Sequence, residues 1–102
     1  MPHLIFEISR YVEDYFPGII ECTLIDAVGA YHTFVVKVPT VTWADLSAES
    51  KYPQPGAVRG EIAAQWNDGD RALVRFSTAD PDGVESVSGI STFVVFADQV
   101  QA

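Results

Sequence analysis

The amino-acid sequence predicts an all-β domain: a small antiparallel β-barrel or two-sheet roll of about six strands, with at most one short helical turn. Hydrophobic and polar residues alternate with a period of two through most of the chain, which is the pattern of strands with one buried face. The connections are shorter than the crossovers that parallel strands require, so we expect antiparallel pairing. Such a small sheet must close or fold over to protect its edges.

Length and composition indicate one globular domain spanning residues 1–102. The chain has 102 residues, and no repeat or linker divides it. Hydrophobic residues make up 48% of the chain and charged residues 20%, which favours a packed core over disorder. Cys22 is the only cysteine, so an internal disulfide is excluded. Because no signal peptide and no bilayer-spanning stretch is recognisable, we expect a cytoplasmic protein.

The first half of the chain predicts one strand and a hairpin. In residues 3–8, "HLIFEI", the alternate apolar residues are expected to face inward. Residues 18–27 and 31–39 read as two strands that turn near Val28-Gly29. Prolines end regular pairing after them, and residues 40–50 allow one short helical turn capped by Thr42 or Asp45.

The second half predicts a second hairpin and a final strand. Residues 58–66, "VRGEIAAQW", alternate so that Trp66 continues an inward face, and we expect this side chain to lie in the core. "NDGD" then forms a tight turn into the strand at 71–78. The last strand, within 89–100, is apolar on both faces around Phe93–Phe96. This predicts a central strand or an outer face covered by something else.

Net charge limits the class of partner. Fourteen Asp and Glu residues against six Lys and Arg give a formal charge of −8. Nucleic acids and anionic membranes are therefore disfavoured, because binding phosphates requires clustered cations. A basic protein partner would be attracted, and its encounter with this chain would be accelerated.

Two acidic, glycine-containing segments, "NDGD" and "DPDGVES", raise the question of a calcium site. The second offers Asp80, Asp82 and Glu85, but it lacks the ligand spacing and flanking helices of an EF-hand. We therefore interpret both segments as turns and predict no metal and no cofactor. Glu85 is predicted to bond to backbone N–H groups or to one of three arginines, with a rim carboxylate at a ligand site as the alternative. Those arginines are Arg59, Arg71 and Arg75.

Cysteine, histidine, aspartate and tryptophan residues are further site candidates. Cys22 and His32 should lie too far apart on the first hairpin for a nucleophile and its base, so Cys22 is predicted to be a buried hydrophobe. Asp26 is expected opposite His32 as a structural cross-strand pair, with a ligand contact as the alternative. Trp43 lies in a loop segment and is the candidate partner anchor. His3 is expected near a mobile terminus.

Several fragments together resemble a group of short, uncharacterised bacterial β-proteins. The resemblance covers residues 18–100 and leaves the N-terminal segment 1–17 unmatched. Size and acidity are also similar to those of immunity proteins, which implies a toxin-neutralising role by analogy. The shared positions are Glu21-Cys22, Asp26-Ala27-Gly29-His32, Lys37-Pro39, Tyr52-Pro53-Gly56, Pro81-Gly83-Glu85-Ser86 and Asp98-Gln99.

The sequence contains no nucleophile elbow, zinc-protease helix or phosphate-binding loop, so a non-enzymatic function is favoured. The leading hypothesis is an acidic binding protein, in the form of an immunity protein, that covers a basic protein partner. One alternative is a self-associating structural module, such as a homodimer. The other is a small-molecule binder or enzyme that uses a barrel mouth near Asp26, His32 and Glu85.

Overall fold

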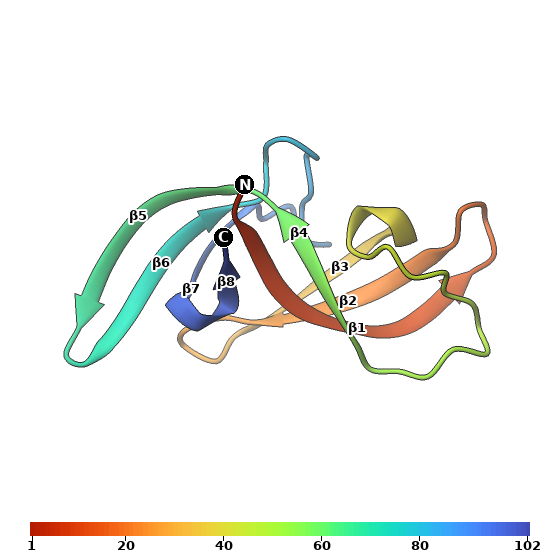
Figure 1. Ribbon diagram of the computed structural model, residues 1–102, viewed down its shortest axis with the longest axis horizontal. Helices are drawn as coiled ribbons and strands as arrows, with labels where there is room; N and C mark the ends of the chain where they lie inside the picture. Colours follow the sequence, from red (N-terminus) through yellow and green to blue (C-terminus); the bar gives the residue numbers. More distant parts are fainter.

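The chain forms two antiparallel sheets, so the all-β prediction is confirmed. The computed structural model describes all 102 residues. One sheet has the strand order β3-β2-β1-β4, with β8 pairing to the start of β1, and the other has the order β5-β6-β7 (Figure 1). The strands are β1 (His3–Glu13), β2 (Ile19–Ile25), β3 (Tyr31–Lys37), β4 (Gln54–Arg59), β5 (Glu61–Asp68), β6 (Arg71–Ser77), β7 (Thr92–Phe96) and β8 (Val100–Gln101).

Strand β1 is the central strand of the larger sheet. It pairs with β2 along its second half and with β4 along its first half, while β8 pairs with its first two residues. Its alternate side chains, Leu4, Phe6 and Ile8, are buried as the period-two pattern predicts. The expectation of a mobile terminus at His3 is wrong, because that residue pairs with both Arg59 and Gln101.

Aromatic packing joins the two sheets. The ring centroid of Phe34 on β3 lies 5.6 Å from that of Phe6 and 5.5 Å from that of Phe93 on β7. Edge-to-face and tilted rings at these separations stabilise a core beyond simple burial of area. The core consists of 15 buried hydrophobic residues: Leu4, Phe6, Ile8, Ile20, Cys22, Leu24, Phe34, Val38, Val41, Val58, Val74, Phe76, Val84, Phe93 and Val95.

The chain passes from one sheet to the other through a single residue, Gly60, between β4 and β5. A Cβ atom at this position would overlap the carbonyl oxygen of Ser77 and the ring of Phe76. The backbone at Gly60 therefore lies as close to the end of β6 as a glycine permits. Because this bend separates β4 from β5, residues 58–66 do not form one strand. Of the two predicted architectures, the barrel is wrong, since the strands form two separate antiparallel sheets.

Strand β5 contains a bulge that changes which face each side chain occupies. Ile62 pairs with Phe76, but Ala64 pairs with Arg75, so Ala63 is an extra residue. One inserted residue reverses the alternation. Trp66 consequently lies opposite Leu73, on the face away from the core, and 36% of its surface is exposed. The prediction of a core Trp66 is wrong for this reason.

The β5–β6 hairpin projects from one end of an elongated molecule with axes of 44, 25 and 24 Å (Figure 1). The "NDGD" turn prediction is confirmed, with Gly69 at φ 64° between the two strands. Strand β7 is an edge strand rather than a central one. The alternative prediction for this strand is an outer face covered by another group. The Arg71 guanidinium does lie over the Phe96 ring on that face.

Two short 3-10 helices replace the one helical turn that was expected. They are η1 (Val38–Thr40) and η2 (Ala97–Gln99). Pro39 starts η1, while Thr42 only accepts a hydrogen bond from the Ala44 N–H and caps no helix. Pro55 does not end pairing, because it lies in β4, which sits at the edge of its sheet. Neither helix approaches the length and hydrophobicity that crossing a membrane would require.

Replacing Gly60 by Ala should lower the free energy of unfolding by about 3 kcal/mol or more, because the new methyl group overlaps backbone that cannot move independently. Urea denaturation measures the loss. Gly29→Ala is the matched control: φ is +85° there, but nothing lies within 4 Å of the added Cβ. That control should cost only about 1 kcal/mol. Equal losses in the two variants would contradict the steric argument.

Candidate functional site

Asp26 and His32 meet at the β2–β3 turn, as the sequence predicts. Nε2 of His32 lies 2.8 Å from Oδ2 of Asp26, and a carboxylate only accepts, so this nitrogen carries the donated proton. The predicted register is wrong by two residues, since His32 pairs with Leu24. The pair forms because Asp26 follows the end of β2 and its side chain reaches back over the turn.

The Asp26 carboxylate is fully engaged within the turn. Its Oδ1 accepts the backbone N–H groups of Val28 and Ala30 at 3.0 and 2.9 Å. Burial on its own would raise the pKa of Asp26, but the hydrogen bonds from His32, Ala30 and Val28 outweigh it and lower the pKa below its ordinary value. This is the arrangement of a structural clamp that holds the turn.

The same turn is fastened to the second sheet. The N–H of Ala27 donates to the carbonyl of Val94 on β7 at 2.9 Å, and the Gln99 side chain donates to the carbonyl of Ile25 at 2.9 Å. The His32 ring also packs edge-on against Phe93, with centroids 4.9 Å apart. Asp26 and His32 therefore hold the junction between the sheets, which accords with the preferred structural interpretation.

Cys22 is buried in the core, so its prediction as a small hydrophobe is confirmed. Burial first, and then the neighbouring Glu21 charge, raise the pKa of its thiol to about 12. A thiol of this kind holds its proton at neutral pH and is a poor nucleophile.

Glu85 is exposed and forms neither of the bonds predicted for it. The three arginines are engaged elsewhere: Arg59 with Asp82, Arg71 over Phe96 and Arg75 over Trp66. The structural role predicted for Glu85 is therefore wrong. The turn is held instead by buried Thr78, which donates to the carbonyl of Val84 at 2.7 Å, and by Ser86, which accepts the N–H of Ile90 at 3.1 Å.

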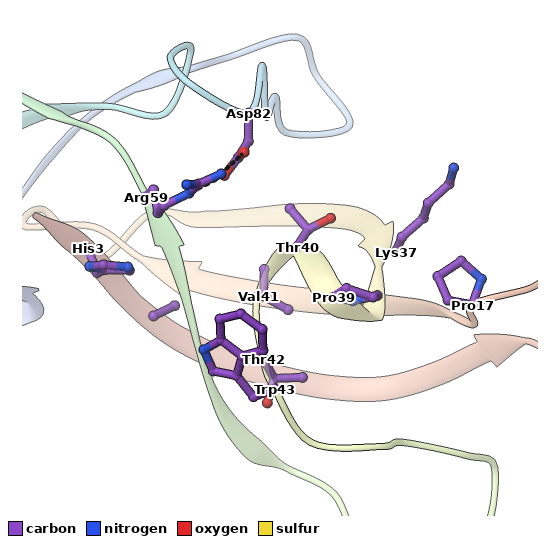
Figure 2. A pocket seen from close by; sticks show the side chains of 11 residues that line it. His3, Pro17, Lys37, Pro39, Thr40, Val41, Thr42, Trp43, Arg59 and Asp82 are labelled. Atoms are coloured by element: carbon purple, nitrogen blue, oxygen red, sulfur yellow. Dashed lines mark hydrogen bonds and ion pairs between the residues drawn. The ribbon is translucent and has the colours of Figure 1, made fainter. Parts of the chain in front are cut away.

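A groove beside Trp43, called here the Trp43 groove, lies on the surface of the larger sheet (Figure 2). It has a volume of about 560 Å³ and lies between the η1 segment, strand β4 and the turn that carries Asp82. Trp43 is completely exposed, at 104% of its reference surface. Its lining residues are His3, Pro17, Lys37, Pro39, Thr40, Val41, Thr42, Trp43, Ala57, Arg59 and Asp82.

The groove walls are held in place by backbone and side-chain bonds. The N–H of Ala57 on β4 donates to the carbonyl of Val41 at 2.9 Å, which fixes the segment before Trp43 against the sheet. Arg59 and Asp82 form a bidentate pair, with nitrogen–oxygen distances of 3.1 and 2.6 Å. This pair raises the pKa of Arg59 and closes one end of the groove (Figure 2). Lys37 forms no ion pair.

Of the four predicted contact residues, only Trp43 lies on this groove. Asp26 and His32 form the separate clamp, and Glu85 lies on the exposed loop beyond Ser77. Sequence reasoning missed Arg59 and Asp82 as a pair because 23 residues separate them and only the Gly60 bend brings them together. No family model, curated protein sequence or solved structure matches the chain.

No cluster of metal ligands lies at the Asp26–His32 pair or at the Trp43 groove. No group of three or more His, Cys, Asp and Glu side chains is arranged to hold an ion. In the "DPDGVES" turn, Asp82 is directed to Arg59 rather than toward the other acids. The turn interpretation of this segment is consistent with that contact.

Replacing Asp26 by Asn should lower the free energy of unfolding by about 1–3 kcal/mol at pH 7. In the variant an NH₂ group replaces one of the two acceptor oxygens, so the His32 N–H no longer donates to a carboxylate. The folded pKa of Asp26 lies below its unfolded value of about 3.9, so its contribution is present above that pH. It is lost as the pH falls through the folded pKa.

Urea denaturation of both proteins from pH 7 down to acid measures this difference. The difference in free energy of unfolding between the unaltered protein and the Asp26→Asn variant should decrease in acid. Asp80→Asn, at an exposed carboxylate, is the control and should change little at any pH. A gap that stays constant into strong acid would contradict the assigned role.

Proposed function

We propose that this chain is a non-enzymatic binding protein that holds a basic protein partner against the Trp43 groove. The observation that supports it is the complete exposure of Trp43. A tryptophan held in water gives nothing to the core, whereas at an interface it supplies a large contact area and a ring N–H donor. Tryptophan is also strongly enriched among the residues that dominate binding energy.

The shape of the groove supports insertion of a partner's side chain or loop. Its volume lies within the ~300–1,000 Å³ typical of binding pockets. Its lining includes Pro39 and Thr40 of the η1 segment, whose side chains are short. Because these groups have little conformational freedom, a partner would lose little entropy from the groove side on binding.

The groove lining carries Lys37 and the paired Arg59 and Asp82, but the loops that flank the groove are acidic and favour a basic partner. The loop that follows Trp43 carries Asp45 and Glu49, and the loop across the groove carries Asp80 and Glu85, all exposed. With a net charge of −8 for the chain, these side chains would accelerate encounter with a cationic surface. A toxin-neutralising protein is one binder of this kind. The lone buried Cys22 also suits the reducing cytosol in which we propose that it acts.

Photo-crosslinking from position 43 tests this proposal. A photoreactive phenylalanine analogue at Trp43 should capture one discrete basic protein in the source cell, and the same analogue at Val28 should not. Val28 is the matched control because it is 87% exposed and lies on the β2–β3 turn, outside the groove. Identical crosslinking from both positions, or none from position 43, would contradict the proposal.

Trp43→Ala should weaken binding of the captured partner by about tenfold to a thousandfold, the usual range for an anchor residue. The free energy of unfolding should change by less than about 0.5 kcal/mol, since the side chain contacts no core residue. Titration calorimetry and urea denaturation measure the two effects. A large loss of stability would instead place Trp43 among the structural residues.

A further inference from the structure

The outer face of the β5-β6-β7 sheet combines arginines with aromatic rings. Cross-strand pairing places Trp66, Leu73 and Phe96 in one row across the three strands. Arg71 and Arg75 lie on the same face of β6, on either side of Leu73. We call these five residues the arginine face. The opposite face of β6, with Val74 and Phe76, is the one that packs into the core.

Both guanidinium groups on this face are held by rings and are free of carboxylates. Arg71 Cζ lies 4.0 Å from the centroid of Phe96, and Arg75 Cζ lies 5.4 Å from that of Trp66. Neither forms an ion pair, although Asp68 is the cross-strand neighbour of Arg71. Stacking fixes the plane of each guanidinium and leaves its N–H edge available, so the face is prepared to bind carboxylates.

A surface of complementary chemistry lies at the other end of the same molecule. The end of β1 and the turn that follows it carry Glu13, Asp14, Tyr15 and Phe16 in succession, and all four are exposed. Tyr15 is 70% exposed and Phe16 is 89% exposed. We call these four residues the acidic tip. Figure 1 places this turn and the β5–β6 hairpin at opposite ends of the long axis.

We infer that copies of this chain associate head to tail, with the acidic tip of one copy bound on the arginine face of the next. The carboxylates of Glu13 and Asp14 would meet the guanidinium groups of Arg71 and Arg75. The rings of Tyr15 and Phe16 would cover the apolar row between them. In the isolated chain these rings are exposed and these charge-assisted hydrogen bonds are not formed. Association would therefore gain both contributions.

Charge complementarity selects a second copy as the occupant. The arginine face holds two cations free of ion pairs on a chain of net charge −8, and the acidic tip joins two carboxylates to two exposed rings. A contact between two different surfaces is heterologous, so it generates rings or open chains rather than a symmetric dimer.

Sedimentation over a concentration series, at low and at high salt, tests the inference. The chain should associate as its concentration rises toward about 1 mM, and salt should weaken the association. The double variant Arg71→Gln, Arg75→Gln should weaken it by about tenfold or more. Lys51→Gln, at an exposed lysine outside the face and the groove, is the control for the loss of positive charge.

The acidic tip gives a sharper test, because neutralising acids reduces the general repulsion between copies. The double variant Glu13→Gln, Asp14→Asn should nevertheless weaken association by about tenfold or more. Asp80→Asn, Glu85→Gln also removes two negative charges, from exposed acids outside the arginine face and the acidic tip, and should leave association unchanged or strengthen it. If both acidic double variants strengthen association, the tip has no specific role and the inference is wrong.

Mixing the two defective proteins completes the experiment. The arginine-face variant retains its tip and the tip variant retains its face, so an equimolar mixture should form a one-to-one complex that grows no further. A chain that stays monomeric to about 1 mM at low salt would overturn the inference. Tight binding of the arginine face to an acidic peptide or to single-stranded nucleic acid, without self-association, would also overturn it.

Discussion

The bend at Gly60 is the constraint on which the rest of the structure depends. The chain leaves β4 and enters β5 within one residue, and no side chain fits between that residue and β6. The two sheets therefore meet along only part of their length, around Phe34 and Phe93. Beyond that region the β5–β6 hairpin continues without the larger sheet behind it, so both of its faces can offer side chains to water (Figure 1).

Asp26 and Cys22, which the sequence offers as candidates for a chemical site, have structural roles in the folded chain. The Asp26 carboxylate accepts hydrogen bonds from His32 and from two backbone N–H groups, and the Cys22 thiol keeps its proton in an apolar setting. What the fold leaves free is surface: Trp43 on its groove, and arginines over rings on the projecting hairpin. Both proposals therefore concern these surfaces rather than a buried reaction centre.

Periodicity predicted the residues that pack within single, regular strands. Leu4 and Ile8 on β1, and Val74 and Phe76 on β6, are buried as their alternation indicates. The pairing of Asp26 with His32 was also predicted, although from a register two residues away, because a turn side chain can reach across that difference.

Two of the wrong predictions, the core position of Trp66 and the closure into a barrel, have physical sources near the crossing. A single extra residue, Ala63, moves Trp66 to the other face, and nothing in the local sequence distinguishes a bulge from an uninterrupted strand. The Gly60 bend separates the sheets, so closure could not be judged from strand count alone. The Trp43 groove was beyond prediction for the same reason, since its Arg59–Asp82 wall depends on how the sheets are joined.

Native-state hydrogen exchange tests the central claim most directly, namely that stability resides where the sheets meet and that the hairpin beyond is supported only by its own ladder. The amides of Cys22, Phe34 and Phe76 should exchange only through global unfolding. Those from Gln65 to Leu73 should exchange through local opening, at a clearly lower free energy. Equal protection of the hairpin and the shared core would contradict this account of the fold.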